Sequence, residues 1–213
     1  MTYFADVAAL ARKDLLIELR AKETVPAMLV FVVSTLVVFH FAVPVGVNHE
    51  VALGMLWVAI LFTALLGLTR AFVPEREQSL FDALVMAPSD RSAIWLAKAF
   101  SVFTFLIVAQ AVALPAFAIF FFGIGWRTVA AVVLADIGIC SVGTLTGAMA
   151  VAGKARELIL PLLFLPLSIP IIVGGVGASI VHNGNKYLEF LVLYDAVFAI
   201  VSWAAFEYVV AEA

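Results

Sequence analysis

The stretch VALGMLWVAILFTALLGLTRAFV, residues 51–73, decides the fold class of this chain. It holds a single charged side chain, Arg70, among residues that are almost all apolar. A helix rises about 1.5 Å per residue, so about 20 apolar residues cross a bilayer core roughly 30 Å thick. The stretch is long enough to do so and predicts a transmembrane helix.

The composition of the whole chain agrees with this prediction. Of its 213 residues, 65% are hydrophobic and 13% are charged. Soluble domains carry about 25% charged residues, so half that share indicates an integral membrane protein. A net charge of −3 leaves no basic field to hold phosphates and excludes a nucleic-acid binder. Cys140 is the single cysteine, so no internal disulfide can form, and we expect it to pack as a small apolar residue.

Five further apolar runs have the length of a membrane span. All are continuous, which favours helices over the alternating strands of a barrel. We therefore predict an all-α membrane protein, with residues 1–213 forming one transmembrane domain of six helices. The predicted spans are 25–46, 51–73, 94–122, 128–152, 158–181 and 188–210.

Lysine and arginine residues set the predicted orientation, because they concentrate on the cytoplasmic side of membrane proteins. With an even number of spans, only Arg127 and Lys186 fall on the side opposite the N-terminus. We therefore predict that both termini are cytoplasmic. The basic residues on that side are Arg12, Lys13, Arg20, Lys22, Arg70, Arg76, Arg91, Lys98, Lys154 and Arg156.

Residues 1–23 predict an amphipathic helix that lies on the inner leaflet. Asp6, Lys13 and Arg20 recur every seven residues along one side. The helix is either a membrane-surface anchor or an anchor whose charged side also contacts a cytoplasmic partner. The apolar face is expected to comprise Tyr3, Phe4, Val7, Ala8, Ala11, Leu15 and Leu19.

Residues 74–91, PEREQSLFDALVMAPSDR, interrupt the apolar runs with a predicted cytoplasmic helix. Pro74 suits a first helical position, the acidic residues favour the first turn, and Pro88 ends the helix. Its apolar stripe must lie on the membrane or in a groove of a partner. The acidic side chains favour the partner, since anionic lipids repel them. The residues expected at that contact are Glu75, Glu77, Leu80, Phe81, Asp82 and Leu84.

Two polar residues fall at similar depth inside predicted spans. Asp136 is an ionisable group in the fourth span, and Gln110 in the third could hydrogen-bond to it. Asp136 either stabilises helix packing or contacts a substrate or partner. Asp195 and Glu207, near the ends of the last span, are expected to reach the interface.

The fifth span carries three helix breakers, Pro161, Pro166 and Pro170. Each removes a backbone donor, and Gly174, Gly175 and Gly177 follow. We expect this span to be bent and to end in a broken or re-entrant piece. In the fourth span, Gly143 and Gly147 form a GxxxG pattern that is typical of helix packing.

Residues that could bind a metal or perform catalysis form no recognisable set. His40, His49 and His182 fall near the outer side, either as haem or metal ligands or as ordinary interfacial histidines. Their spacing supports no ligand set. The chain has no nucleophile elbow, HExxH motif or cysteine pair. We expect neither a metal site nor enzymatic activity.

Several segments resemble a known family of membrane proteins. The arrangement of spans resembles the ABC-2-type (type V) exporter permeases. More closely, the chain resembles the haem exporter B subunit of cytochrome c maturation (CcmB) from about residue 10 to the end. Ser79 departs from the glycine and threonine common there in the family. The similar segments are KDLLIELR (13–20), GLTRAF (67–72), EREQ (75–78), DALVMAP (82–88), DRSAI (90–94) and RELILPLLFLP (156–166).

The resemblance implies a permease subunit in the bacterial inner membrane without ATPase chemistry of its own. A cytoplasmic ATP-binding subunit would dock on residues 74–91, so that 74–91 acts as a coupling helix. Two copies of each subunit, other haem-handling membrane subunits and a periplasmic haem chaperone would complete the assembly. ATP would be bound by the partner and haem handled by the complex, with no cofactor held by this chain. The complex would export haem or release the haem-loaded chaperone.

Two other functions stay open at this point. The same architecture serves permeases that export a lipid or a drug. A proton-coupled carrier that depends on Asp136 would belong to a different transport class.

Overall fold

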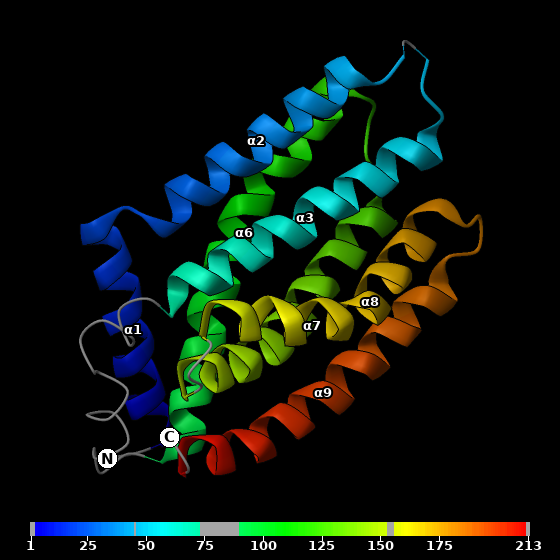
Figure 1. Cartoon of the computed structure of the whole chain (residues 1–213). Helices are drawn as coiled ribbons and strands as arrows, with labels where there is room; N and C mark the ends of the chain where they lie inside the picture. Colours follow the sequence, from blue (N-terminus) through cyan, green and yellow to red (C-terminus); the bar gives the residue numbers. More distant parts are fainter. Residues whose placement is uncertain (1–2, 45, 73–89, 153–155, 212–213) are drawn as a thin grey trace.

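The computed structural model describes residues 3–44, 46–72, 90–152 and 156–211. Seven helices and no strands occur in these ranges (Figure 1), so the predicted all-α fold is confirmed. In chain order they are α1 (Tyr3–Ala21), α2 (Thr24–Ala42), α3 (His49–Ala71), α6 (Arg91–Phe120), α7 (Trp126–Ala152), α8 (Arg156–Ile180) and α9 (Asn185–Ala211).

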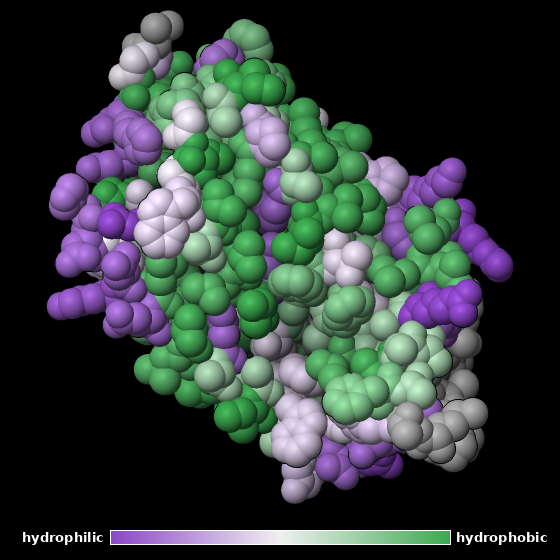
Figure 2. All heavy atoms as spheres, turned by 180° about the vertical axis from the view of Figure 1, so that it is seen from behind, coloured by the Kyte–Doolittle hydropathy of each residue, from purple (hydrophilic) through white to green (hydrophobic). Residues whose placement is uncertain are grey.

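Six of these helices, α2 to α9, are long and apolar enough to cross a membrane. Figure 2 shows apolar side chains over the middle of the molecule and hydrophilic ones gathered toward its ends. The predicted spans match these helices closely, and the chain is a multi-pass membrane protein. The first span ends at Ala42 rather than residue 46, since Val43 is extended. Pro44 follows Val43 and disfavours the α conformation there.

Helix α7 lies at the centre of the bundle. It packs along α8 and α9 and also contacts α3 and α6. The buried share of its apolar window is 67%, compared with 17% for α2 and 22% for α9. Helices α2 and α9 therefore form the edges of the bundle, and most of their apolar surface is left for lipid or a partner.

Helix α1 lies across one end of the bundle rather than along it (Figure 1). It packs against the beginning of α6. Lys22 adopts a left-handed φ of 55°, and its N–H donates to Glu18 O, which ends α1 and lets the chain turn into α2. We call this end of the molecule the α1 end and the opposite one the distal end.

Helix α8 continues through all three prolines. The prediction that this span ends in a broken or re-entrant piece is therefore wrong. In Figure 1 its axis changes direction along its length. Two side-chain donors satisfy carbonyls in this region: Ser168 Oγ donates to Leu165 O, and Tyr194 on α9 donates to Leu167 O. The packing of α8 against α3, α7 and α9 lets the helix tolerate proline inside a membrane.

The glycines of α8 serve close packing rather than a break in the helix. The α-carbon of Gly175 lies against the indole of Trp57 on α3, and that of Gly177 lies against the Tyr187 ring on α9. A methyl group at either position would overlap the aromatic ring. The GxxxG pattern of α7 works in the same way, because Leu68 covers Gly143 and Phe72 covers Gly147.

Candidate functional site

The residues predicted to contact an ATP-binding subunit lie outside the described residues: Glu75, Glu77, Leu80, Phe81, Asp82 and Leu84. The structure does describe the residues at both ends of that connection. Phe72 follows the last turn of α3, and Asp90 precedes the first turn of α6. Both ends lie at the α1 end of the bundle, and we take their surroundings as the candidate functional site.

Asp90 caps the N-terminus of α6. Its Oδ1 accepts hydrogen bonds from Ser92 Oγ at 2.8 Å and Ser92 N at 2.9 Å. These two bonds lower the pKa of the Asp90 carboxyl below its ordinary value. Tyr3 of α1 places its hydroxyl 3.2 Å from Ser92 Oγ, and Arg91 donates to Glu207 O on α9. The beginning of α6 is thereby fastened to both α1 and α9.

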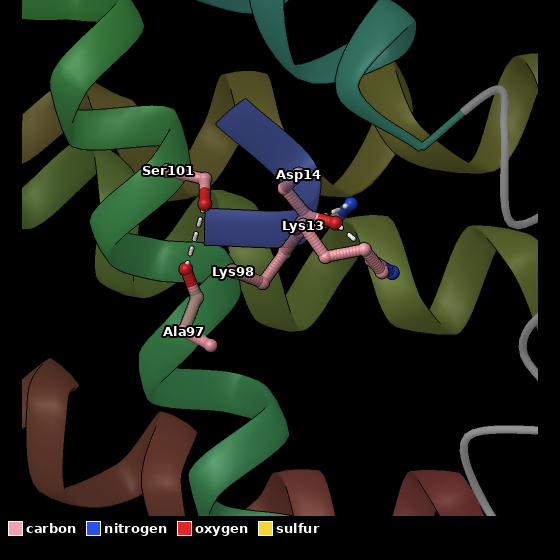
Figure 3. Close-up of polar contacts among 5 residues, drawn as sticks. All are labelled: Lys13, Asp14, Ala97, Lys98 and Ser101. Carbon is pink, nitrogen blue, oxygen red and sulfur yellow. Dashed lines mark hydrogen bonds and ion pairs between the residues drawn. The ribbon is translucent and has the colours of Figure 1, made fainter. Parts of the chain in front are cut away.

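An ion pair joins α1 to α6 one to two turns further along. Lys98 Nζ lies 3.3 Å from Asp14 Oδ2, and Lys13 Nζ lies 3.0 Å from Asp14 Oδ1 (Figure 3). The side chains of Lys98 and Asp14 are only 9% and 11% exposed. A buried pair of this kind specifies geometry, because removing one partner leaves the other charge poorly solvated. Ser101 donates to Ala97 O on the same stretch of α6.

The Phe72 ring connects this ion pair to the centre of the bundle. Lys98 Nζ lies 5.0 Å from its centroid, which is within range of a cation–π interaction. The same ring covers Gly147 of α7. Phe72 is 5% exposed although it lies outside the helix. Phe72 therefore joins the end of α3 to α6 and α7, and Lys98 extends this connection to Asp14 of α1.

A small polar cavity lies beside the ion pair. Its volume is about 30 Å³, which accommodates water. Its polar lining consists of Asp14, Glu18, Thr24, Arg70, Lys98 and Ser101.

The faces of α1 differ from the predicted ones. Tyr3 and Ala11 pack toward the bundle, whereas Phe4 and Leu19 are 78% and 67% exposed. The apolar residues therefore do not form one lipid-facing stripe. The carboxyl of Asp14, which interrupts the apolar pattern in the sequence, is the group that holds α1 to α6.

The structure brings Gln110 and Asp136 together in the interior. Gln110 Nε2 donates to Asp136 Oδ1 at 3.5 Å, and Asp136 is fully buried. Among the described residues, Asp136 Oδ2 and Gln110 Oε1 have no hydrogen-bond partner. The contact is long for a hydrogen bond, so the pair links α6 to α7 weakly.

Asp195 is the functional candidate that the sequence reasoning missed. It was expected to reach the interface, but it is 6% exposed and its Oδ1 lies against Gly138 of α7. Neither carboxyl oxygen has a partner within the described part of the chain. Asp136 precedes Gly138 by two residues, so it points to another side of α7.

The three histidines lie at the distal end. His40 contacts the rings of Phe41, Phe120 and Phe121, and His49 stacks on Phe122 with centroids 3.8 Å apart. His182 offers its backbone carbonyl to Arg127 Nη1. In the described ranges, no group of three or more His, Cys, Asp or Glu side chains could hold a metal ion.

Comparison with known proteins assigns the chain to a family. The family model described as "CcmB protein" matches residues 5–211. The chain belongs to the CcmB family. It is 30% identical to heme exporter protein B of Paracoccus denitrificans over 83% of this chain and 82% of that protein. It is 29% identical to heme exporter protein B of Bradyrhizobium diazoefficiens, over 81% and 80% of the two chains. The corresponding protein of Pseudomonas aeruginosa is 28% identical, over 79% and 78%.

Membership of the CcmB family agrees with the described bundle. The match spans α1 and all six membrane helices, and the chain covers about four fifths of each relative. The resemblance inferred from the sequence segments is therefore confirmed.

Proposed function

We propose that this chain is the membrane subunit of an ABC transporter for c-type cytochrome biogenesis. The observation that carries the proposal is the CcmB family match across residues 5–211, over a bundle of six spans. The relatives are named heme exporter protein B, which supports a role in haem export. The complex exports haem or releases the haem-loaded periplasmic chaperone.

A separate cytoplasmic ATP-binding subunit supplies the energy in this proposal. It docks on residues 75–84, and this chain contributes no catalytic group to ATP hydrolysis. Two copies of each subunit are joined by other haem-handling membrane subunits. Haem is cargo of the complex, and this chain holds no cofactor of its own.

The distribution of basic residues supports an orientation in the bacterial inner membrane. In the described part of the chain, Arg127 and Lys186 lie at the distal end, and most of the other basic residues lie at the α1 end. The rule that positive residues face the cytoplasm then places the α1 end and both termini inside. The site around Phe72 and Lys98 would face the ATP-binding subunit.

One specific observation favours a second candidate, a proton-coupled carrier. Asp136 is fully buried and one of its oxygens lacks a partner among the described residues. Intramembrane carboxyls commonly serve as proton relays. This candidate requires a titratable group at residue 136, so Asp136→Asn would abolish transport. The ABC proposal predicts that Asp136→Asn is tolerated.

The test of the proposed function combines a deletion with one double substitution. Deleting the gene should abolish covalent haem attachment to c-type cytochromes, whereas a permease for lipids or drugs would leave attachment intact. In the intact protein, Leu80→Asp combined with Phe81→Asp should prevent co-purification of the ATP-binding subunit in mild detergent. The variant should still insert in the membrane. Normal ATPase association and normal cytochrome c levels in this variant would overturn the proposal.

A further inference from the structure

We propose that the Phe72 ring is the mechanical contact through which movement at the end of α3 reaches the central helix α7. This inference rests on the proposed function, in which an ATP-binding subunit acts on the connection between α3 and α6. It adds the residues that pass the movement into the membrane. Each of these residues lies in the described part of the chain.

The contact between Phe72 and α7 leaves no free space. A Cβ placed on Gly147 would lie 2.7 Å from Cδ2 and Cζ of the ring. Real Cβ atoms do not come this close to other carbons, so the ring touches the backbone of α7 itself. Protein interiors of this density transmit displacement instead of absorbing it. A shift of Phe72 toward α7 must therefore move α7 as well.

The ring also contacts Lys98 of α6, which in turn pairs with α1. Lys98 Nζ lies 5.0 Å from the ring centroid and pairs with Asp14 of α1 at 3.3 Å. The side chains of Lys98 and Asp14 are largely buried. If Lys98 left the ring, it would lose its contacts with Phe72 and Asp14, and water could replace them only poorly. A displacement of Phe72 consequently also disturbs the contact that joins α6 to α1.

The pair formed by Leu68 and Gly143 distinguishes this contact from ordinary packing. Leu68 covers Gly143 one turn earlier on the same two helices, with equally close atoms. Leu68 lies within α3, whereas Phe72 is the residue that ends it, with φ −102° and ψ 1°. Phe72 is thus the side chain at which the connection enters the packed bundle. Gly143 provides a matched control for the effect of crowding alone.

The experiment compares Gly147→Ala, Gly143→Ala, Phe72→Leu and the double variant Gly147→Ala with Phe72→Leu, each in the full complex. Covalent haem attachment to c-type cytochromes is measured per unit of membrane-inserted protein and of co-purified ATP-binding subunit. We expect Gly147→Ala to lower this ratio at least about fivefold, the lower end of usual coupling effects. The double variant should recover most of the loss, because the smaller leucine makes room for the added methyl group.

Two results would overturn the inference. One is a normal ratio in Gly147→Ala. The other is an equal loss in Gly143→Ala and Gly147→Ala, which would show that crowding between α3 and α7 is the whole effect. If Gly147→Ala fails to accumulate, Phe72→Leu tests the inference instead. The inference then requires that Phe72→Leu lowers the ratio and that the double variant restores it. If wild-type protein binds no ATP-binding subunit, the proposed function itself fails, and this outcome is distinct from the other two.

Discussion

Trp57 on α3 donates its indole Nε1–H to Ser179 Oγ on α8 at 3.1 Å, and its ring lies against Gly175. Trp57 is fully buried, so this contact fixes how far apart α3 and α8 lie near the distal end. Ser179 also donates its hydroxyl hydrogen to Gly175 O, which leaves the lone pairs of Oγ to accept from the indole. A single glycine thus decides whether Trp57, the largest fully buried side chain among the described residues, fits.

Gly175→Ala should therefore destabilise the protein. The added methyl group would overlap the Trp57 ring, and overpacking of this kind costs roughly 1–3 kcal/mol. Thermal unfolding in detergent measures the effect. Gly54→Ala is the matched control, because nothing lies within 4 Å of a Cβ at Gly54 in α3. Alanine there should be neutral or stabilising, since it favours the helix over glycine. Equal melting temperatures for the two variants would contradict the packing assignment.

Lys98→Met should loosen α1 from the bundle. The substitution removes the cation that holds Asp14 of α1 to α6. Lys13 still pairs with the Asp14 carboxylate, so the loss should be smaller than the roughly 3–5 kcal/mol that breaking an isolated buried pair costs. Trypsin should then cleave faster at the basic residues of α1, such as Arg12 and Arg20. Lys186→Met, an exposed substitution at the distal end, should leave the cleavage rate of α1 unchanged. An unchanged rate in Lys98→Met would show that other contacts hold α1.

Asp136→Leu should be more harmful than Asp136→Asn. Leucine leaves the buried Gln110 amide without its acceptor, at a cost of about 1–3 kcal/mol, whereas asparagine can still accept the hydrogen bond. The double variant Asp136→Leu with Gln110→Leu should regain stability, because neither polar group stays buried alone. Melting temperatures of the four proteins test this order. Loss of cytochrome c maturation in a stable Asp136→Asn variant would instead support the proton-coupled carrier.

The Asp90 cap should give a pH-dependent contribution to stability. Its carboxyl has a lowered pKa in the folded protein because it accepts two hydrogen bonds from Ser92. The contribution is therefore complete above the ordinary pKa of 3.8 and is lost as the pH falls through the lower folded-state pKa. Asp90→Ala should cost about 1 kcal/mol at neutral pH, and this difference from wild type should shrink in acid. Asp90→Asn keeps a capping oxygen without the titration, so its stability should not follow the same pH dependence.

Much of the fold could be predicted from local features of the sequence. Residues 51–73 become α3, and the other five apolar runs become the remaining spans, because hydropathy over about 20 residues is sufficient to specify a membrane helix. The main error of prediction concerned α8, which was expected to break at its prolines but is one continuous helix. Pro166 and Pro170 would end a helix in water, but α8 stays helical through both where it packs against α3, α7 and α9.

The candidate site could be predicted only in part. The GxxxG pattern indicated a packing surface on α7, but its partners Leu68 and Phe72 were not evident from the sequence. Asp195 was misplaced at the interface for a related reason. Its depth follows from its position in the chain, whereas its burial against Gly138 depends on how α9 is rotated.

The sequence by itself determined the class of the protein, its spans and the clustering of positive charge at one end, since hydropathy and charge act over short stretches of chain. The tertiary structure alone decided that Phe72 rests on Gly147, that Lys98 pairs with Asp14, and that α1 divides its apolar residues between the bundle and its exposed face. These contacts depend on the rotation and crossing of helices that are far apart in the chain. Close packing between side chains and glycines sets that geometry, and no local pattern encodes it.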